Sequence, residues 1–189
     1  MKKRLCLTLA CLLFAGLPFL LAQGFKPPAD GKAVVYFVRV TSLGFAVGFQ
    51  YFDQDKYIGL FKGKSYFRYE CDPGKHLLWA SSENKEFLTA DLKAGGTYVV
   101  IVDVAMGIGK ARVGLTPVGD TNTEAFKRAR GLVHKKPPEV NEQEKIDKMQ
   151  VKLKGFMADK LKMYEEHWKA EKNFKSIEAD MALSEDALK

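Results

Sequence analysis

Residues 57–79 read YIGLFKGKSYFRYECDPGKHLLW, and this stretch decides the fold class of the 189-residue chain. Short runs of aromatic and aliphatic residues alternate with turns that contain glycine, at residues 63–64 and 72–74. The pattern is typical of consecutive strands joined by tight turns. It predicts a β-meander, and it names no chemistry.

The same alternation of strands and turns extends on both sides of this stretch. Turn residues recur about every ten positions from residue 33 to residue 118, and no segment with a helical period lies between them. We therefore expect a mainly β protein, with an antiparallel β-sandwich of about seven or eight strands over residues 33–119 and a C-terminal helical extension. The expected strands are residues 33–40, 45–51, 57–61, 66–71, 76–81, 85–92, 98–106 and 111–118.

The pattern changes after Gly119. Residues 120–134 begin with the capping sequence DTNT and are predicted to form a short helix. Residues 135–139 read KKPPE and are predicted to be a linker. Residues 140–182 carry apolar side chains at spacings of three and four, which predicts one long amphipathic helix, and residues 183–189 are predicted to be a frayed tail.

The predicted long helix suggests a contact surface. It would extend roughly 60 Å, whereas a sandwich of this size is at most ~40 Å across. Unless Gly155 breaks the helix, part of the apolar stripe would project and bind an envelope protein or a second copy of the chain. The alternative that stays open is that the helix folds back on the sandwich. The candidate partner-binding residues are Phe156, Leu161, Tyr164 and Trp168.

The N-terminus has the pattern of a secretory signal peptide. Lys2, Lys3 and Arg4 precede an apolar run, and the small residue Ala22 precedes Gln23. We expect residues 1–22 to be cleaved near Ala22, residues 23–32 to lead into the sandwich, and the protein to reach the periplasm or cell envelope. Lipid attachment at Cys11 is disfavoured, because the apolar run before that cysteine is short.

Charge and aromatic content suggest two further binding classes. The formal net charge is +7, and without the three basic residues of the leader it becomes +4, from 27 basic and 23 acidic residues. Mild basicity and export argue against a nucleic-acid partner. A basic cluster could bind anionic lipid or polysaccharide phosphate, and it comprises Lys127, Arg128, Arg130, Lys135 and Lys136. Carbohydrate binding would need exposed aromatics, for which the candidates are Tyr51, Tyr57, Tyr66 and Trp79.

The titratable residues do not form a recognisable catalytic motif. Outside the leader, His76, His134 and His167 lie in separate segments and Cys71 is the single cysteine. The sequence has no HExxH, paired-cysteine or GxSxG motif, so we expect no catalytic residues, metal or cofactor. One alternative is a hydrolase that uses Cys71 and His76, which flank the turn at residues 72–74.

Five segments resemble exported bacterial proteins of the family called domain of unknown function 2846: GKAVVYFVR at 31–39, GLF at 59–61, SYF at 65–67, PGKH at 73–76 and LKAGGTYVV at 92–100. The resemblance covers about residues 32–118 and leaves the helical extension uncovered. It implies a cell-envelope β-domain, often lipid-anchored, without an established activity, so no functional residue is carried over. The weak lipid-attachment motif at Cys11 departs from the lipoprotein members. We therefore expect a non-catalytic envelope scaffold whose C-terminal helix makes protein contacts.

Overall fold

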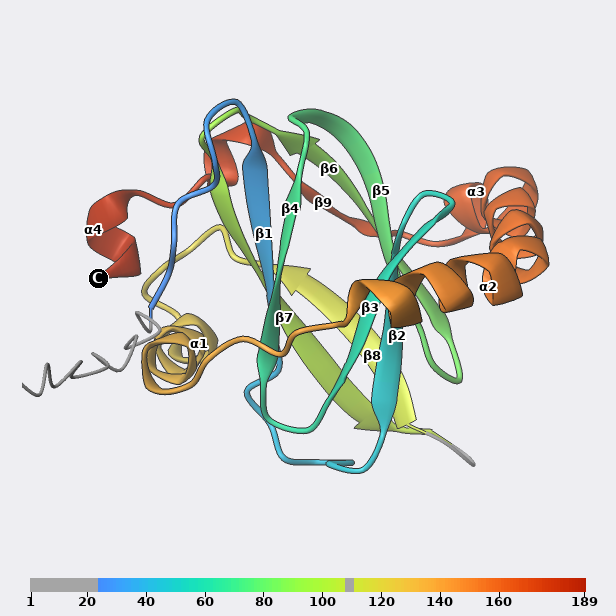
Figure 1. Cartoon of the computed structure of the whole chain (residues 1–189), viewed down its shortest axis with the longest axis horizontal. Helices are drawn as coiled ribbons and strands as arrows, with labels where there is room; N and C mark the ends of the chain where they lie inside the picture. The colour runs from blue at the N-terminus through green and yellow to red at the C-terminus, as the bar shows by residue number, and fades with distance from the viewer. Residues whose placement is uncertain (1–23, 108–110) are drawn as a thin grey trace, which may run out of the picture.

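The computed structural model describes residues 24–107 and 111–189 (Figure 1). The predicted leader, with Cys11, Ala22 and Gln23, lies outside the described residues. The prediction of a mainly β protein with a C-terminal helical extension is confirmed. The first eight strands are β1 (Ala33–Val38), β2 (Gly48–Asp53), β3 (Lys56–Lys62), β4 (Tyr66–Cys71), β5 (Gly74–Ser81), β6 (Lys85–Leu92), β7 (Thr97–Met106) and β8 (Ala111–Pro117).

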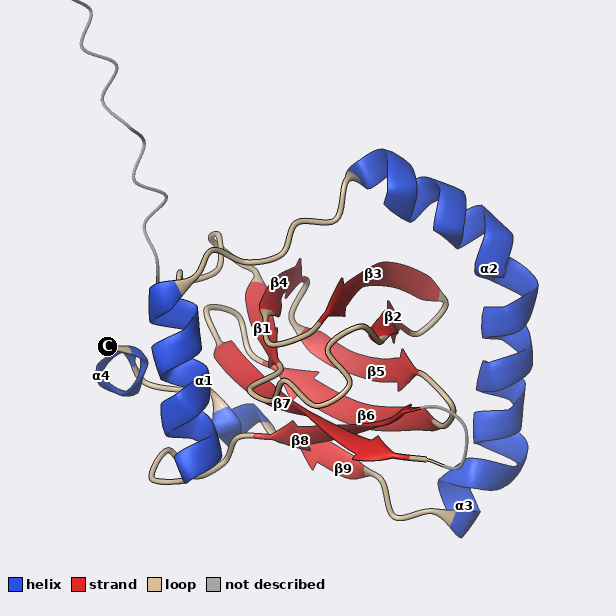
Figure 2. Cartoon of the chain, turned by 90° about the horizontal axis from the view of Figure 1, so that it is seen from below, coloured by secondary structure: helices blue, strands red, loops and turns tan. Residues whose placement is uncertain are grey.

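The strands form two sheets that lie between the helices (Figure 2). The first sheet has the order β4-β1-β7-β8, and the second has the order β3-β2-β5-β6-β9, where β9 is Lys175–Ile177. Most neighbouring strands are antiparallel, as expected of the sandwich, and two pairs differ, because β1 pairs with β7 and β6 pairs with β9 in parallel. Parallel neighbours require a long crossover, which the intervening strands and the C-terminal helices supply.

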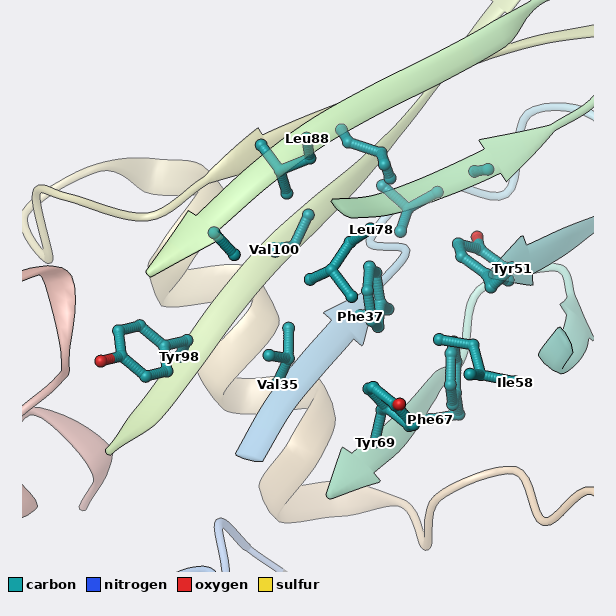
Figure 3. Close-up of a cluster of buried hydrophobic side chains, with 14 of the residues drawn as sticks. Val35, Phe37, Tyr51, Ile58, Phe67, Tyr69, Leu78, Leu88, Tyr98 and Val100 are labelled. Carbon is teal, nitrogen blue, oxygen red and sulfur yellow. The ribbon is translucent and has the colours of Figure 1, made fainter. Parts of the chain in front are cut away.

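The main core lies between the inner faces of the two sheets (Figure 3). Alternate residues of each strand point inward, as Val35 and Phe37 do on β1. The Phe37 ring stacks on Phe67 with centroids 5.0 Å apart. This core holds the two sheets face to face, and it thereby fixes the positions of the free edges of β3 and β4.

Helices cover the outer faces of both sheets (Figure 2). Helix α1 (Glu124–Lys135) begins where Thr123 Oγ1 accepts the N–H of Phe126 at 3.2 Å. It packs Phe126, Leu132 and Val133 on the first sheet. Helix α2 (Gln143–Met163) packs on the second sheet, so the molecule has four layers.

The long helix predicted for residues 140–182 is wrong beyond Glu171. A π-helical turn, Tyr164–Trp168, and the short α3 (Lys169–Glu171) follow α2, and the chain then becomes extended and forms β9. The apolar spacing of this segment is compatible with a helix or a strand. The strand forms because pairing with the free edge of β6 buries Ile177 in the main core. Gly155 lies inside α2 and does not break it.

The last residues are held against the sandwich, so the predicted frayed tail is wrong. After β9 come a 3-10 turn, Ala179–Met181, and the four-residue α4 (Glu185–Leu188). Leu183 N donates to Thr97 O at 2.9 Å, and His134 Nε2 donates to Leu188 O at 2.8 Å. Across residues 24–107 and 111–189, no helix is both long enough and apolar enough to cross a membrane.

Candidate functional site

A cavity of about 440 Å³ opens between the free edges of β3 and β4, where the two sheets part. Residues 56–58 of β3 and 67–69 of β4 form its walls, and residues 138–141 of the linker before α2 cross beside it. We call it the edge cavity. A concave site with both apolar and charged groups is the kind of place where proteins bind ligands.

The linker connects the two sheets at this opening. Glu139 N donates to Tyr66 O on β4 at 2.8 Å, and Asn141 Oδ1 accepts Leu60 N on β3 at 3.0 Å. Asn141 can come this close only because residue 59 is glycine. Gly59 has a φ of +146°, and a Cβ on it would lie 2.6 Å from Asn141 Nδ2.

The edge of β3 is closed by side chains. Beyond the contact with Asn141, Gln150 of α2 accepts Tyr57 N through Oε1 at 2.6 Å and donates from Nε2 to Asp55 O at 2.7 Å. The amide of Gln150 therefore replaces a neighbouring strand for this part of β3. The backbone groups of Asp55, Tyr57 and Leu60 are therefore already paired at this edge.

The edge of β4 stays open after Tyr66. Backbone groups alternate along a strand, so Arg68, two residues after Tyr66, also turns its N–H and C=O toward the free edge. Among the described residues, no further segment pairs with β4 on that side. The open backbone groups border the edge cavity.

Two cationic side chains border the same cavity. Lys56 Nζ lies 5.6 Å from the centroid of the Tyr69 ring. Arg68 Nη2 donates to Glu70 Oε2 at 2.5 Å, which lowers the pKa of Glu70, and to Pro27 O at 3.0 Å. The Nε of Arg68 is buried and has no hydrogen-bond partner among the described residues.

A buried polar network lies behind Tyr69. Asp53 is 7% exposed, and its Oδ2 accepts the Tyr69 hydroxyl at 2.9 Å and His76 Nδ1 at 2.7 Å. The hydrogen bond to Asp53 is the main cause that raises the pKa of His76 to about 10, with a smaller contribution from Cys71. Burial and the charge of Asp53 hold the pKa of Tyr69 well above its usual range.

This network engages the histidine that the hydrolase alternative would use. His76 Nε2 lies 2.9 Å from Asp72 O, and both ring nitrogens therefore face atoms that can only accept. The ring therefore donates at both positions when it is protonated, which the raised pKa of His76 favours, and the neighbouring thiol of Cys71 is buried. The structure gives His76 the role of balancing the charge of Asp53.

The predicted partner-binding residues lie against the protein's own second sheet, and the expected overhang of the stripe is wrong. Tyr164 is buried and stacks on Phe87 with centroids 4.5 Å apart. Phe156, Leu161 and Trp168 are half-buried in the same cluster. The helix folds back because the outer face of this sheet carries Phe52, Trp79 and Phe87, which need covering.

The other predicted binding residues are dispersed or buried. Of the basic cluster, Lys127 pairs with Glu124 at 2.9 Å, Arg128 and Lys135 are exposed, Arg130 is half-buried, and Lys136 Nζ reaches Lys64 O at 3.2 Å. The aromatic candidates for carbohydrate binding are all 4% exposed or less, so that expectation is wrong for Tyr51, Tyr57, Tyr66 and Trp79.

Sequence reasoning missed Asn141, which lines the edge cavity, and the neighbouring residues Asp53 and Gln150. Asp53 stands in a DQD sequence typical of a turn, and Asn141 and Gln150 stand in a polar stretch. No spacing connects these residues, because the linker and helix meet β3 only in the tertiary structure. The isolated glycine within strand β3 was the one local signal of a close backbone approach. A scan of the chain against protein-family models finds no match, and a search of curated proteins finds none either.

Proposed function

We propose that the chain is a non-catalytic protein of the cell envelope, exported by its predicted leader, which binds an extended peptide segment of a partner protein at the edge cavity. The observation that carries the proposal is the open edge of β4 at Arg68, which borders the cavity. It continues the same edge of β4 on which Tyr66 already accepts a hydrogen bond from Glu139. The leader and the resemblance to domain of unknown function 2846 support the envelope location.

The chemistry of the site favours a strand as the ligand. An added strand pairs through backbone groups and places alternate side chains into neighbouring pockets. Here the N–H and C=O of Arg68 would pair with the peptide, and a side chain of the peptide would enter between Ile58 and Tyr69. Lys56 and Arg68 would favour an acidic residue in that peptide by charge complementarity.

The proposal keeps an envelope protein as the partner and moves the contact away from the helix. The apolar stripe of α2 packs on the second sheet. Its residues therefore stabilise the fold rather than present a surface to a partner, and they include Phe156, Leu161, Tyr164 and Trp168. The edge of β4 is open for pairing without any rearrangement of the core. A second copy of the chain could offer its own strand to this edge, and the experiment separates that outcome.

The test places a photocrosslinking side chain at Val140, which borders the cavity and is 83% exposed, in living cells. The matched control is Val151, which is 79% exposed on α2. We expect Val140 to capture a distinct envelope protein and Val151 not to capture it. Equal capture at both positions would refute the site, and crosslinks between two copies would replace a peptide partner with self-association.

Two substitutions at one position then test strand pairing. Arg68→Ala removes the guanidinium alone, whereas Arg68→Pro also removes the N–H that faces the free edge. Proline is tolerated at such a position because that N–H does not pair with β1. We expect Arg68→Ala to weaken capture and Arg68→Pro to abolish it, with thermal unfolding as the control for folding. Equal capture by the two variants would rule out strand addition.

A further inference from the structure

Apolar side chains are exposed at the end of the sandwich away from His76. Residues 39–47 join β1 to β2, and residues 41–47 of this connection contain no charged residue. Phe45 is 74% exposed and Leu43 is 46% exposed. A Cβ on Gly44 would lie 3.7 Å from Val104, so the loop lies beside β7, which ends at the exposed Met106. Exposed apolar groups gathered at one end of a protein mark an interaction site.

A buried arginine holds this loop in its exposed position. Arg39 is 0% exposed and lies 5.1 Å from the centroid of the Phe49 ring. Its guanidinium donates to Val47 O at 2.9 Å, to Gly44 O at 2.7 Å and also to Leu43 O. Burying a charge is unfavourable unless acceptors surround it, and here the acceptors are the carbonyls of the loop. With these carbonyls turned inward, the loop keeps a defined shape while its apolar side chains stay in solvent.

Lysines lie next to the apolar loop. A Cβ on Gly63 would lie 3.4 Å from Phe45 O, so the β3–β4 turn adjoins the loop. This turn carries the exposed Lys62 and Lys64, and Lys136 Nζ donates to Lys64 O at 3.2 Å. Apolar tips flanked by lysines match the two layers of a membrane surface, acyl chains below and anionic headgroups above.

The start of the described chain lies on the same side. Gly24 N donates to Val133 O at 3.1 Å, three residues before Lys136. Glu139 is an acid near the turn, and its carboxylate accepts Ser65 Oγ at 2.7 Å. Lys62, Lys64 and Lys136 give this part of the surface three exposed cationic side chains.

We propose that this end of the sandwich docks on an anionic phospholipid bilayer. Phe45 and Leu43 enter the boundary between headgroups and acyl chains, and Lys62, Lys64 and Lys136 contact lipid phosphates. The docking surface lies at the far end of β2 from Asp53, so it leaves the edge cavity free for a peptide.

The test is cosedimentation of the purified protein with vesicles of equimolar phosphatidylglycerol and phosphatidylcholine, compared with phosphatidylcholine alone. We expect binding to the anionic vesicles that weakens with salt. Phe45→Ser should lower partitioning about tenfold or more, because an apolar side chain of this size leaves the bilayer. Lys62→Ala with Lys64→Ala should lower it about fivefold for each lysine.

The matched controls lie on the solvent side of α2, where Val151→Ser and the pair Lys152→Ala with Lys154→Ala should leave partitioning unchanged. Equal losses for Phe45→Ser and Val151→Ser would overturn the proposal. Equal binding to both vesicle types, or no binding to either, would also overturn it.

A second measurement reports insertion directly. Relative to the wild type, which already contains Trp79 and Trp168, Phe45→Trp should show a blue shift of its fluorescence on anionic vesicles, whereas Val151→Trp should show none. An unshifted Phe45→Trp spectrum at saturating vesicle concentration would contradict insertion of the loop. Each variant replaces an exposed side chain, so circular dichroism should show the wild-type fold for all of them.

Discussion

Replacing His76 by glutamine should destabilise the protein and remove a specific pH dependence. His76 and Asp53 are 13% and 8% exposed at their side chains, and their hydrogen bond is 2.7 Å long. Glutamine keeps a hydrogen-bond donor and removes the positive charge. Asp53 would then be a buried carboxylate without a compensating charge, and breaking such a pair costs about 3–5 kcal/mol.

The raised pKa of His76 gives a second estimate of the free energy of unfolding that is lost in His76→Gln. Hydrogen bonding to Asp53 raises that pKa from 6.5 to about 10. At ~1.4 kcal/mol for each pH unit by which the pKa is raised, the linkage corresponds to about 5 kcal/mol at most. A raised pKa means that this stabilisation is complete below about pH 6.5 and is lost as the pH rises through about 10. The two estimates agree, and the loss is a large share of the ~5–15 kcal/mol that stabilises a typical domain.

The assay is urea unfolding followed by tryptophan fluorescence, to which the buried Trp79 and the half-buried Trp168 contribute, at several pH values between about 6 and 10. The free energy of unfolding of the wild type should fall across this range, and that of His76→Gln should start about 3 kcal/mol lower and fall less. Because other groups titrate near pH 10, the difference between the two proteins is the quantity to compare. A double-mutant cycle with Asp53→Asn should show strong coupling. A constant difference across the pH range, or coupling near zero, would refute the assignment of His76 as an imidazolium paired with Asp53.

Three further predictions follow from packing. Gly59→Ala should lower the free energy of unfolding, measured in urea, by about 2 kcal/mol or more, because alanine strains the positive φ and displaces Asn141. The control Gly155→Ala meets open space in α2 and should raise the free energy of unfolding by up to ~1 kcal/mol. Equal effects of the two substitutions would contradict the close approach of Asn141 to Gly59. Met157→Ala should lower the free energy of unfolding by about 2–5 kcal/mol, because Met157 of α2 is 1% exposed where the helix packs on the sheet. A loss below about 0.5 kcal/mol would mean that α2 does not pack on the sheet. Arg39→Met should leave the sheets folded and speed hydrogen exchange of residues 43–47, and unchanged exchange would show that the guanidinium does not hold the loop.

The strands could be predicted because their signals are local. The bounds of β4 and β6 match the expected residues, and the Pro-Gly turn before β5 lies where the turn chemistry placed it. The start of β2 was predicted at Phe45 and lies at Gly48. The apolar alternation of residues 45–51 fits a strand. Residues 45–47 form a loop instead, because the buried guanidinium of Arg39 binds the carbonyls of Gly44 and Val47.

The C-terminal segment shows where periodicity becomes ambiguous. Phe174 and Ile177 continue the spacing of the helix stripe, yet Phe174 precedes β9 and Ile177 is the last residue of that strand. Their conformation depends on the free edge of β6, which lies far away in the sequence. The edge cavity was equally hidden, since Asn141 and Gln150 acquire their role only when the linker and α2 reach β3.

The sequence by itself determined the strands β1 to β8, the turns between them, the short helix α1 and the amphipathic character of α2, because these depend on neighbours within a few residues. Only the tertiary structure decided that α2 covers its own sheet, that β1 and β7 run in parallel, and that His76 neutralises Asp53. The physical reason is that burial, edge pairing and charge compensation depend on which distant segments meet, and local patterns carry no record of those meetings.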